Sequence, residues 1–317
     1  MKITVLEPLA VKEDILRNIF KDLTDKGHEL EIFDSISKDE EEQIKRTSDT
    51  DILVIANSPL REKAIRSMKK LKMISVAFTG FDHVDMDVCK EKGIVVSNAS
   101  GYANTSVAEL SVGFAIELFR NIKQMDKKTR EFETKAGFRF RQIKDKNVGI
   151  IGTGAIGIET AKLFRAFGAN ILAYSNRKKE EILKIEGRYL RLEELLKASD
   201  IVTVHLPFNE STKRLIGKKE FELMKKDAIF INCARGQVVD NEALKDALNK
   251  GEIAGAGIDV FDKEPPLDEK DPLLEAKNCI VSPHIGYFTE EAMISRAEIT
   301  KKNIESYLDK KPINVVS

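Results

Sequence analysis

Three glycines at the end of a short apolar run could bind the phosphates of a dinucleotide. Gly152, Gly154 and Gly157 follow Val148-Gly149-Ile150-Ile151 in the pattern G-x-G-x-x-G, and apolar positions 158, 161, 163 and 164 then keep helical spacing. This predicts a strand, a tight turn and a helix. The first glycine permits the turn, the second lets a pyrophosphate approach the backbone, and the third lets helix and strand pack closely. Such a pattern also occurs in ordinary loops, but its flanks favour a dinucleotide site.

The choice of dinucleotide depends on the residues about 20 positions further on. An Asp or Glu there would bind the ribose 2′-hydroxyl of NAD and repel a 2′-phosphate. The sequence instead reads Ser175, Asn176, Arg177 and Lys178, with no acid. The two cations could pair with a phosphate, which favours NADP, although a solvated basic turn and use of NAD stay open. The expected cofactor is therefore NADP or NAD, with NADP slightly favoured.

Composition excludes several classes of protein. Among 317 residues, Lys+Arg and Asp+Glu both number 52, so no net charge attracts nucleic acid or an anionic membrane. No apolar run approaches the roughly 20 residues of a membrane span, and the N-terminus meets Lys2 and Pro8 too early for a signal peptide. Three widely spaced cysteines predict neither a disulfide framework nor a zinc site. A cytoplasmic protein with small-molecule partners is expected.

Alternating apolar and amphipathic segments position these residues. Up to residue 98 the pattern predicts a parallel α/β sheet. Strands are expected at 2–6, 29–33, 51–55, 73–77 and 94–96, with helices near 11–26, 38–47, 60–70 and 84–91. A long helix over 104–124, with one apolar stripe ending at Ile122, leads into a second sheet. Between them, residues 125–145 are expected to form a surface excursion.

The second sheet carries the glycine pattern. Its strands are expected from 146 and at 170–174, 201–205, 228–232, 253–259 and 280–282, and an amphipathic helix at 289–308 ends the chain. A rigid loop is expected at Glu264-Pro265-Pro266-Leu267.

Several further motifs identify a family. They are Gly80-Phe81-Asp82 with Val84-Asp85, Ser106-Val107-Ala108-Glu109-Leu110, the run from Phe221 to Gly236, the run from Ala256 to Pro265, and Val281-Ser282-Pro283-His284-Ile285-Gly286. In this order and spacing they resemble the D-isomer-specific 2-hydroxyacid dehydrogenases from about residue 50 onward. The resemblance implies two doubly wound parallel-sheet α/β domains and a homodimer. A flavodoxin-like substrate domain would comprise 1–100 plus 288–317, and a Rossmann dinucleotide-binding domain 101–287.

The same resemblance implies that Arg235, Glu264 and His284 are catalytic. Reduction of a 2-keto acid needs a hydride at the carbonyl carbon and a proton at its oxygen, and a histidine exchanges protons near neutral pH. Glu264 would fix the tautomer and orientation of the imidazole. Arg235 would bind the substrate carboxylate and keto oxygen through its planar fork.

Cofactor and substrate contacts are also implied by the resemblance. The expected cofactor-binding residues are Gly152, Gly154, Ala155, Ile156, Gly157, Ser175, Asn176, Arg177, His205, Pro207, Cys233, Ala234, Asp259 and Gly286. The expected substrate-binding residues, besides Arg235, are Ala77, Phe78, Thr79 and Gly80, whose backbone N–H groups would bind the carboxylate. Phe78 stands where a small residue is expected, so its ring either narrows the substrate pocket or only packs. His83, beside Asp82 and Asp85, could suggest a metal, but none is expected.

The physiological substrate is open at this stage. Relatives that act on 3-phosphoglycerate carry arginines where this chain has Asn57 and Val76, and some have a regulatory domain that would lie beyond Ser317. A small unphosphorylated acid such as glyoxylate or hydroxypyruvate is therefore favoured over the D-3-phosphoglycerate alternative. A dinucleotide-sensing, corepressor-like binding protein is the alternative from another class.

Overall fold

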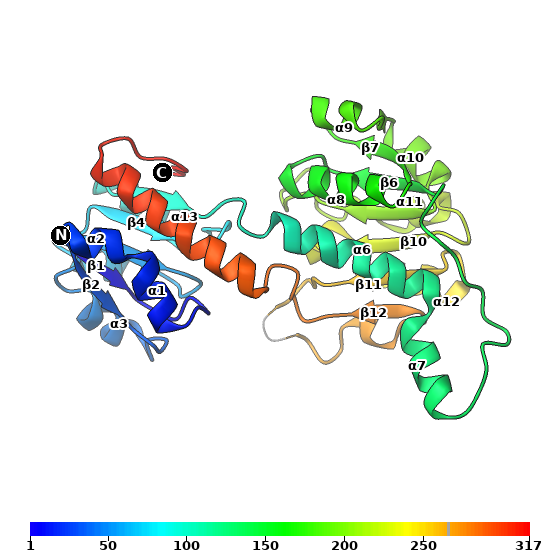
Figure 1. Cartoon of the computed structure of the whole chain (residues 1–317), viewed down its shortest axis with the longest axis horizontal. Coiled ribbons are helices and arrows are strands. Elements are labelled where there is room, and N and C mark those ends of the chain that lie inside the picture. Colours follow the sequence, from blue (N-terminus) through cyan, green and yellow to red (C-terminus); the bar gives the residue numbers. More distant parts are fainter. Residues whose placement is uncertain (265–266) are drawn as a thin grey trace. The chain divides into compact units, whose positions relative to one another are not determined.

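Two parallel sheets organise the chain, and the computed structural model describes residues 1–264 and 267–317. The chain divides into one unit of Met1–Tyr102 with Thr289–Ser317 and a second of Ala103–Phe288 (Figure 1). Within the loop expected at 264–267, Pro265 and Pro266 lie outside the described residues. The assignment of one unit to substrate and the other to cofactor remains a prediction of role.

The first unit contains a five-stranded sheet in the order β2-β1-β3-β4-β5, with every neighbouring pair parallel. The strands are β1 (Lys2–Val5), β2 (Glu29–Ile32), β3 (Ile52–Ile55), β4 (Met73–Val76) and β5 (Val95–Asn98). Successive residues of β3 point to opposite faces: Leu53 and Ile55 belong to one apolar core, Ile52 and Val54 to another. The sheet is thus covered on both faces, as its continuous apolar strands predicted.

Six helices cover this sheet in the described residues. They are α1 (Glu13–Ile19), α2 (Lys21–Asp25), α3 (Glu40–Arg46), α4 (Glu62–Ser67), α5 (Met86–Glu91) and α13 (Glu290–Leu308). The single helix expected near 11–26 was wrong, because Phe20 separates α1 from α2. Helix α13, capped by Thr289, returns from the end of the chain to pack on β4 (Figure 1). Beyond it, the N–H of Val316 donates to the carbonyl of Val96 at 2.9 Å.

The second unit contains a seven-stranded parallel sheet in the order β12-β11-β10-β9-β6-β7-β8. The strands are β6 (Asn147–Ile151), β7 (Asn170–Tyr174), β8 (Arg188–Tyr189), β9 (Ile201–Val204), β10 (Ile229–Asn232), β11 (Gly255–Ile258) and β12 (Cys279–Val281). The strand order reverses between β6 and β9, as in the Rossmann fold, where ligands bind at the carboxyl ends of strands. Both expected sheet types are confirmed, and β8 was missed.

Helices cover both faces of this second sheet. They are α6 (Asn104–Arg120), α7 (Ile122–Arg130), α8 (Ala155–Ala166), α9 (Glu180–Lys184), α10 (Leu192–Ala198), α11 (Lys218–Leu223) and α12 (Asn241–Lys250), with short 3₁₀ turns at Gly236–Val238 and Pro272–Glu275. Helices α6 and α8 pack side by side (Figure 1).

The long helix expected over 104–124 was wrong at its end. Asn121 adopts a left-handed conformation with φ 51°, which ends α6 and starts α7 in a new direction. Ile122 therefore leaves the apolar stripe and is 50% exposed. The surface excursion expected from residue 125 is helical as far as Arg130.

Candidate functional site

The glycine turn has the geometry that a bound pyrophosphate requires. Gly152 has φ +98°, and a Cβ on Gly157 would lie 2.0 Å from the carbonyl oxygen of Gly152, so neither position has room for a side chain. At Gly154, the residue before the 12-residue helix α8, an added Cβ would meet nothing within 4 Å. A helix start leaves its first N–H groups without partners in the helix, and the turn leaves open space at Gly154 in front of α8, which suits an anion.

His205 packs against this turn. Its side chain is buried, its Nε2 is 3.0 Å from Thr203 Oγ1, and a Cβ on Gly152 would lie 2.5 Å from its carbonyl oxygen. Burial lowers the pKa of His205 to about 3, so the ring is neutral. Pro207, two residues on, is exposed. His205 therefore supports the turn through its backbone.

The basic turn, defined here as residues 175–179, follows β7 at the same edge of the sheet. Ser175 is half-buried, and Asn176, Arg177 and Lys178 are exposed. Among the described residues, neither Arg177 nor Lys178 has an ion-pair partner. Both cations are therefore available to a ligand.

The three residues expected to be catalytic follow the ends of three neighbouring strands. Arg235 comes three residues after β10, Glu264 follows β11, and His284 comes three residues after β12. Asn232 shapes the first loop: its Oδ1 accepts from the N–H of Ala234 and its Nδ2 donates to the carbonyl of Arg235, both at 3.0 Å. This brace presents the exposed Arg235 side chain to solvent.

The loop after β10 touches the loop after β11. Gln237 Nε2 donates to the carbonyl of Asp262 at 2.8 Å, and a Cβ on Gly236 would lie 2.1 Å from the backbone carbon of Phe261. These contacts fix the segment that carries Arg235 against the segment that carries Glu264.

Glu264 and His284 form a direct pair. Glu264 Oε1 lies 3.0 Å from His284 Nδ1, with side chains 20% and 36% exposed. Since Nδ1 faces the carboxylate, the second ring nitrogen, Nε2, is left for exchange with a substrate. The ring of Tyr287 stands edge-on to the imidazole at 5.2 Å between centroids.

His284 has an unusual backbone that its neighbours hold in place. Its φ is 54°, a left-handed conformation that is uncommon outside glycine and that occurs at functional sites. The buried carboxylate of Asp259 accepts from Ser282 Oγ at 2.5 Å, from the N–H of Ile285 at 2.8 Å and from the N–H of Gly286 at 2.7 Å. Burial raises the pKa of Asp259, and these donors oppose that shift. Asp259 thus fixes the loop on both sides of His284.

Cys233 and Ala234 are both buried beside Arg235. Burial raises the pKa of the Cys233 thiol well above its ordinary range, so the group is a thiol at neutral pH. This agrees with a packing residue rather than a nucleophile.

In the first unit, the expected substrate cradle follows β4. The N–H of Ala77 donates to the carbonyl of Ile55 at 2.7 Å and so is not available to a ligand. Asn98 Nδ2 donates to the carbonyl of Thr79 at 2.7 Å, which fixes the peptide that follows. Within residues 1–264 and 267–317, the N–H groups of Thr79 and Gly80 have no hydrogen-bond acceptor. These two are the donors that the stretch can offer to an anion.

Phe78 in the same stretch packs within its own unit. Its ring lies 5.9 Å from that of Tyr102 in an edge-on arrangement, and the guanidinium carbon of Arg296 lies 4.6 Å from its centroid. Arg296, on α13, is itself buried. These contacts favour the packing role of Phe78 and leave its effect on a substrate pocket as a prediction.

Residues 112–286, more than half of the chain, match the family model described as D-isomer specific 2-hydroxyacid dehydrogenase, NAD binding domain. The chain belongs to the D-isomer-specific 2-hydroxyacid dehydrogenase family.

Relatives extend the match to the whole chain. It is 33% identical to a hydroxypyruvate reductase of Blautia hydrogenotrophica, with all of both chains covered. It is 36% identical to a D-3-phosphoglycerate dehydrogenase of Methanocaldococcus jannaschii over 97% of this chain but only 57% of that protein. The structure of an acyclic imino acid reductase (Bsp5), in complex with NADPH and D-Arg, is 29% identical with a TM-score of 0.85, covering 100% of both chains.

The dehydrogenase chain also has features that sequence patterns did not single out. Asn232 braces the loop after β10 through local hydrogen bonds. Asp259, as a brace of the His284 loop, and Thr153, within the glycine turn, act through contacts with residues far along the chain. Among residues 1–264 and 267–317, no helix is long and apolar enough to cross a membrane, and no group of three His, Cys, Asp or Glu side chains could hold a metal.

Proposed function

We propose that this dehydrogenase reduces a small, unphosphorylated 2-keto acid to the D-2-hydroxy acid with NADPH or NADH. The observation that carries the proposal is the Glu264–His284 pair, 3.0 Å apart, at the sheet edge that also presents Arg235 and the glycine turn. The relatives are named as enzymes, which leaves no need for the corepressor-like alternative.

The proposed proton transfer follows from the orientation of His284. Glu264 accepts from Nδ1–H, so Nε2 carries the exchangeable proton and donates it to the keto oxygen. When bound, the reduced nicotinamide supplies the hydride. Asp259 accepts from the Ser282 hydroxyl before His284 and from the N–H groups of Ile285 and Gly286 after it, and so holds the loop that carries the ring.

Arg235 is proposed to bind the substrate carboxylate. Arg235 offers a permanently charged planar fork that can donate two parallel hydrogen bonds. Within the first unit, the N–H groups of Thr79 and Gly80, for which the described part of the chain offers no acceptor, are proposed as donors to an anion after β4. The proposed reaction needs no cationic side chain besides Arg235, which suits an acid with one carboxylate.

The absence of cations at two positions supports an unphosphorylated substrate. Asn57, after β3, is exposed but neutral, and Val76 is fully buried in β4. In phosphoglycerate-type relatives these positions are expected to carry arginines that hold the substrate phosphate. The full-length match to a hydroxypyruvate reductase points in the same direction.

A substrate panel tests this proposal. The enzyme is assayed for kcat/KM with glyoxylate, hydroxypyruvate, pyruvate and phosphohydroxypyruvate, each with NADH and with NADPH. Glyoxylate or hydroxypyruvate is expected to give the highest value. A clear preference for the phosphorylated acid would reject the assignment, and tight dinucleotide binding without turnover of any acid would favour the sensor.

We further propose that NADPH is preferred or shared with NADH. The basic turn has no acid that would repel a 2′-phosphate, and its exposed Arg177 and Lys178 have no competing ion pair in the described part of the chain. A structural neighbour carries NADPH.

Replacing Arg177 by alanine is expected to weaken NADPH binding by about tenfold, the lower end for a hydrogen bond to a charged group, because the side chain is exposed. NADH binding should change less than twofold, since NADH lacks the phosphate. Dissociation constants at low and high salt measure both, and the NADPH effect should shrink with salt. Arg130→Ala, which removes an exposed cation on α7, serves as the control. Equal effects on both cofactors would show that the basic turn is only solvated.

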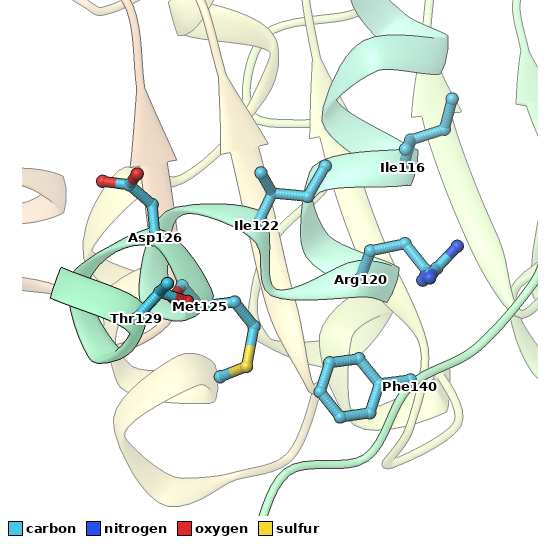
Figure 2. A pocket seen from close by; sticks show the side chains of 7 residues that line it. All are labelled: Ile116, Arg120, Ile122, Met125, Asp126, Thr129 and Phe140. Carbon is cyan, nitrogen blue, oxygen red and sulfur yellow. The ribbon is translucent and has the colours of Figure 1, made fainter. Parts of the chain in front are cut away.

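We also propose a cytoplasmic homodimer. All three cysteines are free, as in a reducing compartment. On the second unit, an apolar groove of about 450 Å³ runs between α6, α7 and the segment of Phe140. Figure 2 shows Phe140 and Met125 facing this groove, with Arg120 beside them. Ile122 is 50% exposed there, and a symmetric dimer would cover the same patch on each subunit.

Ile122→Glu is expected to shift the protein toward monomer, because the change places a charge in the apolar groove. Sedimentation velocity at several concentrations measures the assembly state. Ile36→Glu, at a 66% exposed position of the first unit, is the control and should leave assembly unchanged. A wild-type protein that sediments as a monomer at all concentrations would end the dimer proposal.

A further inference from the structure

The basic turn has almost no backbone support of its own. It lies between β7 and the short helix α9, in neither a helix nor a strand. Apart from the local bond from Ile182 N–H to the carbonyl of Lys179, two hydrogen bonds from outside reach its backbone in the described residues. Whatever makes those two bonds therefore fixes where Arg177 and Lys178 stand.

Both bonds belong to one relay of hydroxyl groups. The N–H of Lys179 donates to the phenolic oxygen of Tyr189 at 2.8 Å. Tyr189 donates in turn to Thr153 Oγ1 at 3.1 Å, and Thr153 Oγ1 lies 3.4 Å from the carbonyl of Arg177, to which it can donate. Each hydroxyl accepts one hydrogen bond and donates one, so the relay is complete without a water.

The relay joins the edge of the sheet to the glycine turn. Tyr189 lies on the two-residue strand β8 and pairs with Ala173 of β7. The phenol of Tyr189 reaches across the end of β7 to Thr153. Thr153 stands between Gly152 and Gly154, is buried, and belongs to the turn at which the pyrophosphate is expected. One side chain thus links the pyrophosphate turn to the cationic turn.

We infer that Tyr189 and Thr153 are positioning residues for the 2′-phosphate of the cofactor. They hold the backbone at Arg177 and Lys179 so that the cations of the basic turn meet the phosphate without first ordering the turn. This rests on the proposed preference for a 2′-phosphorylated dinucleotide. A ligand without that phosphate gains nothing from the ordered cations and should be insensitive to the relay.

Two fragments of the cofactor separate the inference from a general role in folding. 2′,5′-ADP carries the 2′-phosphate and 5′-AMP lacks it, and calorimetry on the full-length protein gives the dissociation constant of each. Tyr189→Phe and Thr153→Val remove one hydroxyl each with little change of shape. Thr153→Ser keeps the hydroxyl, and Tyr307→Phe removes a phenolic hydroxyl from α13 in the first unit.

Wild type is expected to bind 2′,5′-ADP more tightly than 5′-AMP. Tyr189→Phe and Thr153→Val should each weaken 2′,5′-ADP by about three- to tenfold, the value of one net hydrogen bond, and change 5′-AMP by less than twofold. Thr153→Ser and Tyr307→Phe should bind both fragments as wild type does. Hydrogen exchange of the Lys179 amide should accelerate in Tyr189→Phe.

The outcomes separate the two proposals. If wild type prefers 2′,5′-ADP but the relay variants keep that preference, or lose both fragments equally, the positioning role is overturned while the NADPH assignment stands. If wild type shows no preference for 2′,5′-ADP, the NADPH assignment and the positioning role fail together.

Discussion

Replacing His284 by alanine is expected to lower kcat by about 10²–10⁴, the usual contribution of a positioned general acid. In the proposed mechanism the proton is transferred from Nε2, because Nδ1 lies 3.0 Å from Glu264 Oε1. Without the imidazole, water must protonate the keto oxygen, and this loss appears in the transition state rather than in binding. Cofactor affinity should stay within about threefold, since the glycine turn lies at another strand end.

A second substitution guards against an effect of the backbone. His284 has φ 54°, a conformation that Asn adopts more readily than most residues. His284→Asn should therefore keep the loop and still lose kcat to the same extent. The single-turnover rate and the fluorescence-detected affinity for the dinucleotide are measured for both variants. A wild-type kcat in either variant would remove His284 from the mechanism.

Gly157→Ala is expected to destabilise the second unit and to abolish measurable dinucleotide binding. The added Cβ would stand 2.0 Å from the carbonyl oxygen of Gly152, so α8 must move away from the turn. Overpacking of this kind costs about 1–3 kcal/mol and more where backbone meets backbone. At roughly 2–4 °C per kcal/mol for a unit of this size, thermal denaturation should detect the change.

Two other glycines supply the matched controls. Gly154→Ala adds a Cβ that meets nothing within 4 Å, so the fold should be kept while the methyl group hinders the approach of the pyrophosphate. Gly113→Ala, in α6, also meets nothing and should stabilise the helix by about 0.5–1 kcal/mol without affecting the cofactor. If Gly154→Ala bound dinucleotide as wild type does, the glycine turn could not be the pyrophosphate site.

The sequence allowed both sheets to be predicted because their central strands are short, continuous apolar runs. Such runs are typical of strands that are buried on both faces of a parallel sheet. What it could not reveal were features that depend on one residue or on distant partners. Asn121 ends the long helix through its left-handed backbone, and no glycine or proline stands at this position to predict the break. β8 has only two residues, too few for a periodic pattern.

In the candidate site, too, local patterns could be predicted from the sequence and contacts between distant residues could not. The glycine turn was readable because its three positions lie within six residues, whereas the family resemblance was needed for Arg235, Glu264 and His284, which are spread over 50 positions. The bonds of Asp259 to the loop on both sides of His284 join residues 23 to 27 positions apart, so no local pattern reveals them. Its expected contact with the cofactor remains a prediction.

The return of α13 to the first unit has a consequence for biosynthesis. The N-terminal strands leave the ribosome first. Their sheet lacks one of its six covering helices, α13, and the contacts of Val315 and Val316 with β5, until residues 289–317 are translated. The second unit is contiguous in the sequence and can fold while the nascent chain is still attached to the ribosome. An incompletely translated chain would thus carry a folded nucleotide-binding unit and a first sheet with an exposed apolar face. Chaperones would have to bind that face.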